Sequence, residues 1–144
     1  MRALPVLLCL LASPVAAWDA WSDGTLCHLD HAEPHVTVEL TFDPSGPLYS
    51  ITLTRADAPW PQAEVFAIAF SQSAPLTIST TRHQLSGASL RVADTGFGNV
   101  LDGLSFNETA TAQLGDSTVA VDLTGARPEV EAFRDCTRKP PGTA

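Results

Sequence analysis

Three of the four histidines in this chain lie close together, and carboxylates separate them. His28, His31 and His35 alternate with Asp30 and Glu33. Imidazoles and carboxylates are ligands that zinc and copper sites use, so the segment could bind a metal ion. However, the spacing matches no established ligand pattern, and in an extended strand His28 would point away from His31 and His35. The spacing therefore favours the alternative, a solvated loop leading into the first strand.

The rest of the sequence shows no recognisable catalytic or phosphate-binding motif. It has no G-x-S-x-G nucleophile elbow, and the fourth histidine, His83, lies in a turn without an acid close in sequence. In the glycine-rich segment 96–104, Leu101 stands where G-x-G-x-x-G needs its third glycine, and there is no lysine. We therefore predict no cofactor and assign no catalytic residue. An enzyme of unknown reaction remains an alternative.

One tryptophan could serve as a ligand platform. Trp60 lies between Pro59 and Pro61, so the backbone holds it stiffly in a loop. An aromatic ring held in this way can present its face to a ligand or close over an apolar core. The sequence favours the second role, a lid over the core.

The first 17 residues have the features of a cleaved signal peptide. A single positive charge at Arg2 precedes a short apolar run, and the small residues that follow place Val15 and Ala17 where signal peptidase reads them. The apolar run is too short for a spanning helix, which needs about 20 residues. We predict cleavage before Trp18, periplasmic or secreted localisation, and no integral membrane segment in the mature chain.

After cleavage two cysteines remain. In an oxidising compartment Cys27 and Cys136 are expected to form a disulfide between the two ends of one domain. The chain-entropy model assigns such a long loop roughly 4.7 kcal/mol of stabilisation. We predict a single domain over residues 18–136, followed by a flexible tail at 137–144.

The chain is acidic, with 16 Asp and Glu against 8 Lys and Arg and a formal net charge of −8. Removing the leader also removes Arg2 and makes the protein more acidic. A surface of this sign repels phosphate backbones and supplies few cations to release counterions. The composition therefore excludes nucleic acid as an expected partner.

Most of the mature sequence has the period-two pattern of strands with one buried face. Turn residues separate the predicted strands, for example at Ser86-Gly87 and Gly115-Asp116. In the run 65–70 both faces are apolar, which predicts a strand covered on each side. The segment 96–104 is predicted to be a loop with one helical turn. The predicted strands cover residues 36–42, 49–54, 65–70, 76–80, 90–92, 109–114 and 119–123.

The last element is predicted to be a short helix. Pro128 suits the first helical position, and Val130, Phe133 and Cys136 fall on one stripe. Because so short a helix is marginal alone, it must dock on the sheet with Phe133 buried. The fold class is therefore mainly β, an antiparallel sandwich or barrel-like domain with a short C-terminal helix docked by the disulfide.

The chain also resembles a family of small exported proteins of alphaproteobacterial type and unknown function. The resemblance is carried by Thr25-Leu26-Cys27, the segments 65–68, 76–80 and 96–104, and Ala132-Phe133-Arg134-Asp135-Cys136. Members are sometimes labelled as a component of the excision-repair nuclease, excinuclease ABC, a label that the export signal, the negative charge and the missing Walker motif contradict. The terminal Phe-x-x-Cys is more distantly similar to invasion-associated locus B proteins, which would imply an envelope or host-interaction role.

Taken together, the sequence favours a non-catalytic exported β domain that binds a small ligand or an envelope protein. Two alternatives remain open. One is a periplasmic metal-binding protein using His28, His31 and His35, and the other is the enzyme of unknown reaction.

Overall fold

The computed structural model describes residues 17–140, and two antiparallel sheets dominate it. The larger sheet has the strand order β1-β2-β3-β4-β8-β7. In β3 the alternating Val36, Val38, Leu40 and Phe42 are buried, as the sequence pattern requires. Its strands are β1 (Asp19–Ser22), β2 (Cys27–Glu33), β3 (Val36–Asp43), β4 (Leu48–Arg55), β7 (Gln84–Ser86) and β8 (Ser89–Asp94).

The smaller sheet has four strands in the order β10-β9-β5-β6. They are β5 (Phe66–Ser71), β6 (Leu76–Thr80), β9 (Thr109–Leu114) and β10 (Ser117–Asp122). The hairpin between β9 and β10 turns at Gly115, whose φ of +56° is easily adopted by glycine, as predicted. Two helices complete the domain, α1 (Gly98–Ser105) and α2 (Ala126–Arg138).

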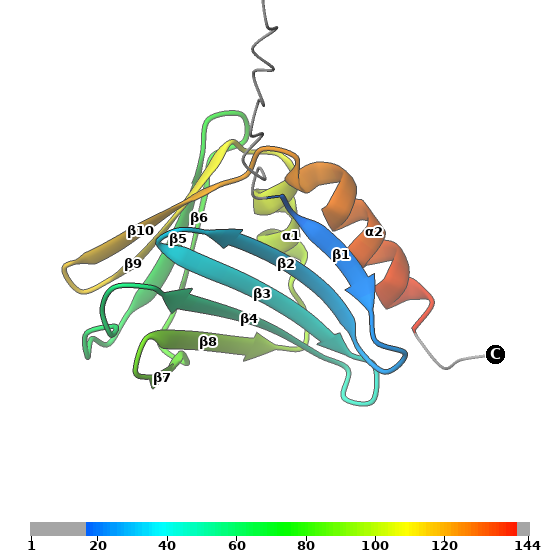
Figure 1. Ribbon diagram of the computed structural model, residues 1–144, viewed down its shortest axis with the longest axis horizontal. Coiled ribbons are helices and arrows are strands. Elements are labelled where there is room, and N and C mark those ends of the chain that lie inside the picture. The colour runs from blue at the N-terminus through cyan, green and yellow to red at the C-terminus, as the bar shows by residue number, and fades with distance from the viewer. Residues whose placement is uncertain (1–16, 141–144) are drawn as a thin grey trace, which may run out of the picture.

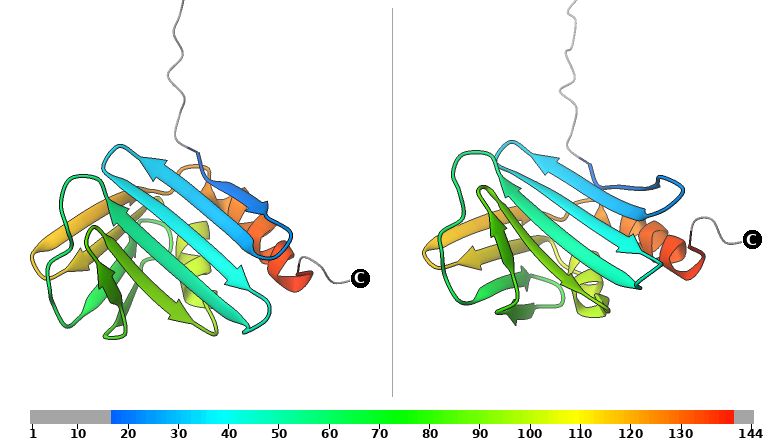
Figure 2. Two further views of the ribbon diagram at one scale, coloured as in Figure 1. Left: turned by 60° about the horizontal axis from the view of Figure 1, so that its bottom comes forward. Right: turned by 90° about the horizontal axis from the view of Figure 1, so that it is seen from below.

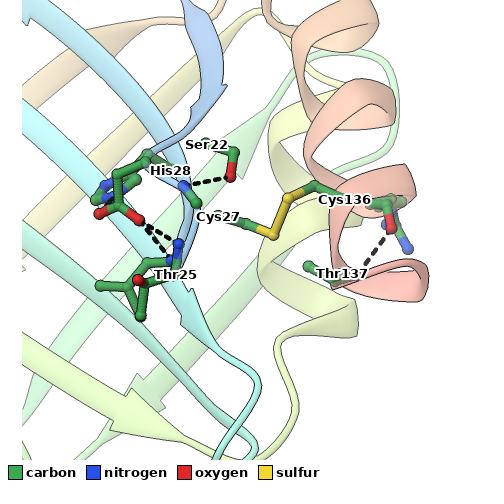
Figure 3. The surroundings of a disulfide bond; sticks show 10 residues. Ser22, Thr25, Cys27, His28, Cys136 and Thr137 are labelled. Atoms are coloured by element: carbon green, nitrogen blue, oxygen red, sulfur yellow. Dashed lines mark hydrogen bonds and ion pairs between the residues drawn. A yellow bond between two sulfur atoms is a disulfide. The ribbon is translucent and has the colours of Figure 1, made fainter. Parts of the chain in front are cut away.

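The sheets and helices form two layers around one core (Figures 1 and 2). The smaller sheet covers one half of the larger sheet's inner face, and the two helices cover the other half. Helix α2 packs against β1 and β2 through a stripe of Ala126, Val130 and Phe133, all of which are buried. Figure 3 shows Cys136 of α2 joined by a disulfide to Cys27 at the start of β2. The predicted fold class, including the docked helix and its disulfide, is confirmed.

The segment expected to be a solvated loop before the first strand is instead β2. Its residues pair with β3 on one side and with β1 on the other. Cys27, Leu29 and His31 point inward and are buried, while His28 and Asp30 are only partly covered. The loop prediction was wrong because the buried face includes a histidine, which interrupts the apolar alternation that identifies a strand.

The prediction that both faces of 65–70 are covered was also wrong. Strand β5 is central, since it pairs with β6 and β9, and Phe66, Ile68 and Phe70 are buried. On the outer face, however, Val65 is exposed and Ala67 is half-buried. The small size of the alanines allows this face to lie near solvent without exposing a large apolar surface.

Both helices are longer than the sequence pattern suggested. The single helical turn predicted at 96–104 is the two-turn helix α1. Helix α2 begins at Ala126, directly after Gly125 with its φ of +77°, rather than at Pro128. It ends at Arg138, two residues past the predicted domain boundary, so Thr137 and Arg138 are helical rather than part of a flexible tail. The predicted leader, apart from Ala17, and tail residues 141–144 lie outside the described residues.

Helix α1 approaches β5 closely at Gly103. A Cβ added to Gly103 would lie 2.6 Å from Cγ of Phe70, whose ring is buried. Alanine would gain about 1 kcal/mol in helix propensity over glycine, but an overlap this close should cost about 2–3 kcal/mol, the upper part of the usual range for overpacking. We expect Gly103→Ala to lower the free energy of unfolding by about 1–2 kcal/mol in urea denaturation.

Gly98→Ala is the matched control in the same helix. A Cβ at Gly98 meets nothing within 4 Å, and its φ is not in the left-handed region. We expect this variant to be as stable as the wild type or slightly more stable. Equal stability of the two variants would contradict the close packing between α1 and Phe70.

Candidate functional site

The structure separates the three clustered histidines by giving each its own partners. His28 lies on the outer face of β2, where its Nε2 donates to Asp23 at 2.9 Å and its ring stacks on Trp21 at 3.9 Å. His31 lies on the inner face and is 5 % exposed. Its ring stacks on Trp18, with 4.4 Å between centroids, and its Nε2 donates to Glu33 at 3.1 Å.

His35 lies in the turn after β2, and its Nε2 donates to the Ala120 carbonyl of β10 at 2.7 Å. The three imidazoles therefore do not face a common point. Among residues 17–140, no three His, Cys, Asp or Glu side chains are grouped so that they could hold a metal ion. The geometry of the described chain thus gives the metal-binding hypothesis no support.

One of these histidines, His35, helps to close one lateral side of the sandwich together with Trp18 and Glu33. Among the described strands none pairs with the outer edge of β10, and side chains from the β1 and β2 region bind its backbone instead. The Glu33 carboxylate accepts from the Asp122 amide at 2.9 Å, and Trp18 Nε1 donates to the Asp122 carbonyl at 3.0 Å. With the His35 bond to Ala120, these contacts occupy edge groups that would otherwise pair with another chain.

The opposite lateral side of the sandwich is hollowed by a cleft. It lies between β4 and β8 of the larger sheet and β5 and β6 of the smaller sheet, with the start of α1 at one end. Its volume is about 390 Å³. The two sheets share no strand pairing on this side, because β6 and β7 are edge strands of different sheets. The cleft thus occupies a gap that the fold leaves between its sheets.

The walls of the cleft are apolar and come from three parts of the fold. Ile78 on β6, Val92 on β8 and Val100 on α1 are each partly exposed, in contrast to the buried core beneath them. Deeper lining comes from Ile51, Phe66, Ile68 and Phe97. An apolar ligand that covers such partly exposed side chains removes their surface from water, and this favours binding.

The rim of the cleft is polar and carries one ion pair. Arg82 follows β6, Asp94 ends β8, and their side chains meet at 3.0 Å. Thr80 and Asn99 also line the rim. The Arg82–Asp94 pair joins the connection after β6 to the end of β8, and both side chains are exposed.

Sequence reasoning did not find this cleft, although its residues follow the period-two pattern. Ile78, Thr80 and Arg82 occupy alternate positions, and so do Leu90, Val92 and Asp94. The pattern shows which residues share a face of a strand. It does not show that β6 and β8 face each other across a gap, which depends on the strand order of both sheets.

A second hollow, of about 430 Å³, lies beside Phe106 and Arg127. It is shallower than the cleft, and Phe106 is its only large apolar residue. The Arg127 guanidinium already lies over the Phe106 ring, 5.0 Å from its centroid. This hollow therefore offers little uncovered apolar surface to a ligand.

Trp60 and His83 are both outside the cleft. Trp60 is 4 % exposed, donates from Nε1 to the Leu53 carbonyl at 3.1 Å and lies beneath the Arg55 guanidinium. This placement matches a lid over the core, and the buried ring leaves no open face for a ligand. His83 donates from Nε2 to the Ala63 carbonyl at 3.0 Å, and its Nδ1 is buried without a partner in the described chain.

The carboxylates with lowered pKa lie at strand ends and in a turn, outside the cleft. Hydrogen bonds from the hydroxyl and amide of Ser45 lower the pKa of Asp43. The same two groups of Thr124 lower the pKa of Asp122, with a smaller contribution from His31. Such side-chain bonds to nearby backbone amides are typical of Asx turns, so these shifts report local structure.

Asp23 has the largest of these shifts, with a pKa of about 2. The causes, in order, are the Leu26 amide, the His28 imidazole and the Thr25 amide, which all donate to its carboxylate. The folded state therefore favours the ionised form. Its contribution to stability is complete above the ordinary pKa of 3.8 and is lost as the pH falls through about 2.

We expect a carbon-detected NMR titration to show Asp23 ionised well below pH 3.8. Replacing His28 with glutamine should raise this pKa only part of the way, because both backbone amides remain. An Asp23 that titrates at its ordinary value in the wild type would contradict the turn geometry.

Among residues 17–140, no helix has the length and apolar character needed to cross a membrane. Comparison with known proteins gave no match to a protein-family model, to a curated protein or to a solved structure.

Proposed function

We propose that this protein is an exported, non-catalytic binding domain that holds a small, largely apolar ligand in the cleft between its two sheets. The observation that carries the proposal is the cleft itself, whose apolar walls come from both sheets and whose rim carries a single ion pair. Ligand sites are commonly apolar cavities of about 300–1,000 Å³ with a few polar groups that orient the ligand.

The size and lining of the cleft favour a small ligand over a protein segment. At about 390 Å³ it lies near the lower end of that range. Covering Ile78, Val92 and Val100 would remove apolar surface from water, at roughly 25 cal/mol per Å². A long-chain lipid would extend beyond the entrance.

The polar groups of the cleft support binding rather than catalysis. Its two ionisable side chains, Arg82 and Asp94, are paired with each other. None of the four histidines, all of which are described, lines it. The three carboxylates with lowered pKa are also elsewhere, whereas catalytic sites commonly gather such groups.

Export to the periplasm or the outside is part of the proposal. The Cys27–Cys136 disulfide fits an oxidising compartment. The leader-like first 17 residues and the resemblance to small exported proteins point the same way. The ligand would then be a small molecule of the cell envelope or its surroundings.

Filling the cleft with a large side chain tests the proposal. We would measure binding of the neutral apolar dye N-phenyl-1-naphthylamine by its fluorescence increase, first to the wild type and then to Ile78→Trp. Ile78 points into the cleft, so an indole there should occupy the site and weaken dye binding by at least about tenfold, or 1.4 kcal/mol.

Thr77→Trp is the matched control, because Thr77 is the adjacent residue of β6 and is exposed on the opposite face. This variant should bind the dye like the wild type. The proposal would be wrong if the wild type failed to bind the dye saturably, or if both tryptophan variants bound it unchanged.

A further inference from the structure

The rim of the cleft has more spare hydrogen-bond donors than spare acceptors. Asp94 is well satisfied, since it accepts from Arg82 at 3.0 Å, from the Thr95 amide at 2.7 Å and from the Thr95 hydroxyl at 3.4 Å. Arg82 has five N–H donors, and within the described part of the chain its guanidinium makes a single hydrogen bond, to Asp94. Its side chain is 72 % exposed, so its remaining donors are accessible at the entrance.

The start of α1 adds to this excess of donors. Residues 98–100 line the cleft at the first turn of α1, where backbone N–H groups have no partner within the helix. No side chain caps this end, and its first turn holds no acidic residue. The positive end of the helix dipole therefore lies beside the cleft and favours a negative charge there.

The donors and the apolar walls occupy different parts of the cleft. Arg82 and Asn99 are at the rim, whereas Ile68 and Ile78 form the wall of the smaller sheet. A ligand that satisfies both regions must have an apolar part and an acceptor-rich head. This arrangement is that of a site for an amphiphile.

Building on the proposed function, we infer that the ligand is a small amphiphile with a carboxylate head group. Its apolar part lies between Ile78 and Val92, and its carboxylate binds the donors of Arg82 that Asp94 leaves free. A carboxylate matches the planar guanidinium in a bidentate geometry. Asp94 keeps its bonds to Arg82 and Thr95.

A cationic head group fits this rim less well. An ammonium would have to take Asp94 from Arg82 and would then lie beside the freed guanidinium. It would also lie near the positive end of α1. The charges around the rim therefore disfavour a cationic head group and favour an anionic one.

Three ligands with the same alkyl chain test this inference. We would compare decanoate, 1-decanol and decyltrimethylammonium, each below its critical micelle concentration, by displacement of N-phenyl-1-naphthylamine. Wild type should bind decanoate about tenfold more tightly than decanol, and decyltrimethylammonium most weakly. Arg82→Gln should lose the preference for decanoate, and Asp94→Asn should strengthen decanoate binding because a negative charge beside the bound carboxylate is gone.

Arg91→Gln is the matched control. Like Arg82→Gln, it removes one positive charge, but Arg91 lies on β8 and faces away from the cleft. Unfolding midpoints would verify that all variants are folded. Equal binding of the three ligands, a preference for the cation, or identical effects of Arg82→Gln and Arg91→Gln would overturn the carboxylate inference while leaving the binding site in place. Absence of any binding, including that of the dye, would overturn the proposed function as well.

Discussion

Replacing Cys27 and Cys136 together with alanine is expected to lower the free energy of unfolding by about 3–5 kcal/mol. The bridge joins residues 109 positions apart and therefore closes a loop that includes almost the whole domain. In the chain-entropy model such a long loop strongly restricts the unfolded state. For a domain with a typical stability of about 5–15 kcal/mol, this loss is large. Urea denaturation followed by circular dichroism would measure it.

The oxidised and reduced forms of the wild type supply the control. Reduced wild type should unfold at nearly the urea concentration of the double alanine variant, since both lack the cross-link. If reduction left the wild-type midpoint unchanged, the bridge would not contribute to stability. Cys27 is fully buried and Cys136 is partly exposed, so reduction under unfolding conditions ensures that the disulfide is opened completely.

Phe133→Ala should have an effect of similar size, about 3–5 kcal/mol. Phe133 is 1 % exposed and is among the largest fully buried side chains. It lies on the buried face of α2 and is edge-on to Tyr49 of β4, with 6.3 Å between ring centroids. Removing its ring leaves a cavity between the helix and the larger sheet, and surrounding side chains collapse into such cavities only partly.

Phe106→Ala deletes the same atoms at a site where they are 40 % exposed. Its main contact is the Arg127 guanidinium, an interaction worth about 0.5–1 kcal/mol at exposed positions. We expect a loss of no more than about 1 kcal/mol in the same urea assay. Comparable losses for the two variants would mean that α2 is not anchored through Phe133.

The larger part of the fold could be predicted because one-sided burial appears directly in sequence. The alternation in β3, and the turn glycines at 87 and 115, identify strands and hairpins without tertiary information. The disulfide followed from the two cysteines that remain after the predicted signal cleavage, and the docking of α2 followed from its single apolar stripe.

Strand β2 was missed because its burial depends on contacts that are distant in sequence. His31 is tolerated on the inner face because Trp18 stacks on it and because Glu33, which also binds the Asp122 amide, accepts from its Nε2. A histidine cluster therefore suggested metal chemistry where the fold uses imidazoles to hold its strands together. The sequence could not distinguish metal binding from a structural role, because the two differ only in which groups contact the imidazole rings.

The cleft could not be predicted because it depends on strand order. Strands β6 and β7 are adjacent in sequence but belong to different sheets, and the chain crosses between them at residues 81–83. This crossing places Arg82 opposite Asp94 and leaves the space between β6 and β8 unfilled. Trp60, the one aromatic residue considered as a ligand platform, is part of the buried core instead.

The most direct test of the binding cleft is a titration of ¹⁵N-labelled protein with N-phenyl-1-naphthylamine, followed by backbone amide shifts. We expect saturable shifts that are largest at Ile78, Val92 and Val100, which approach one another only across the cleft. Saturable shifts centred instead on Trp21 and His28, or the absence of saturable shifts, would contradict a ligand site between the two sheets.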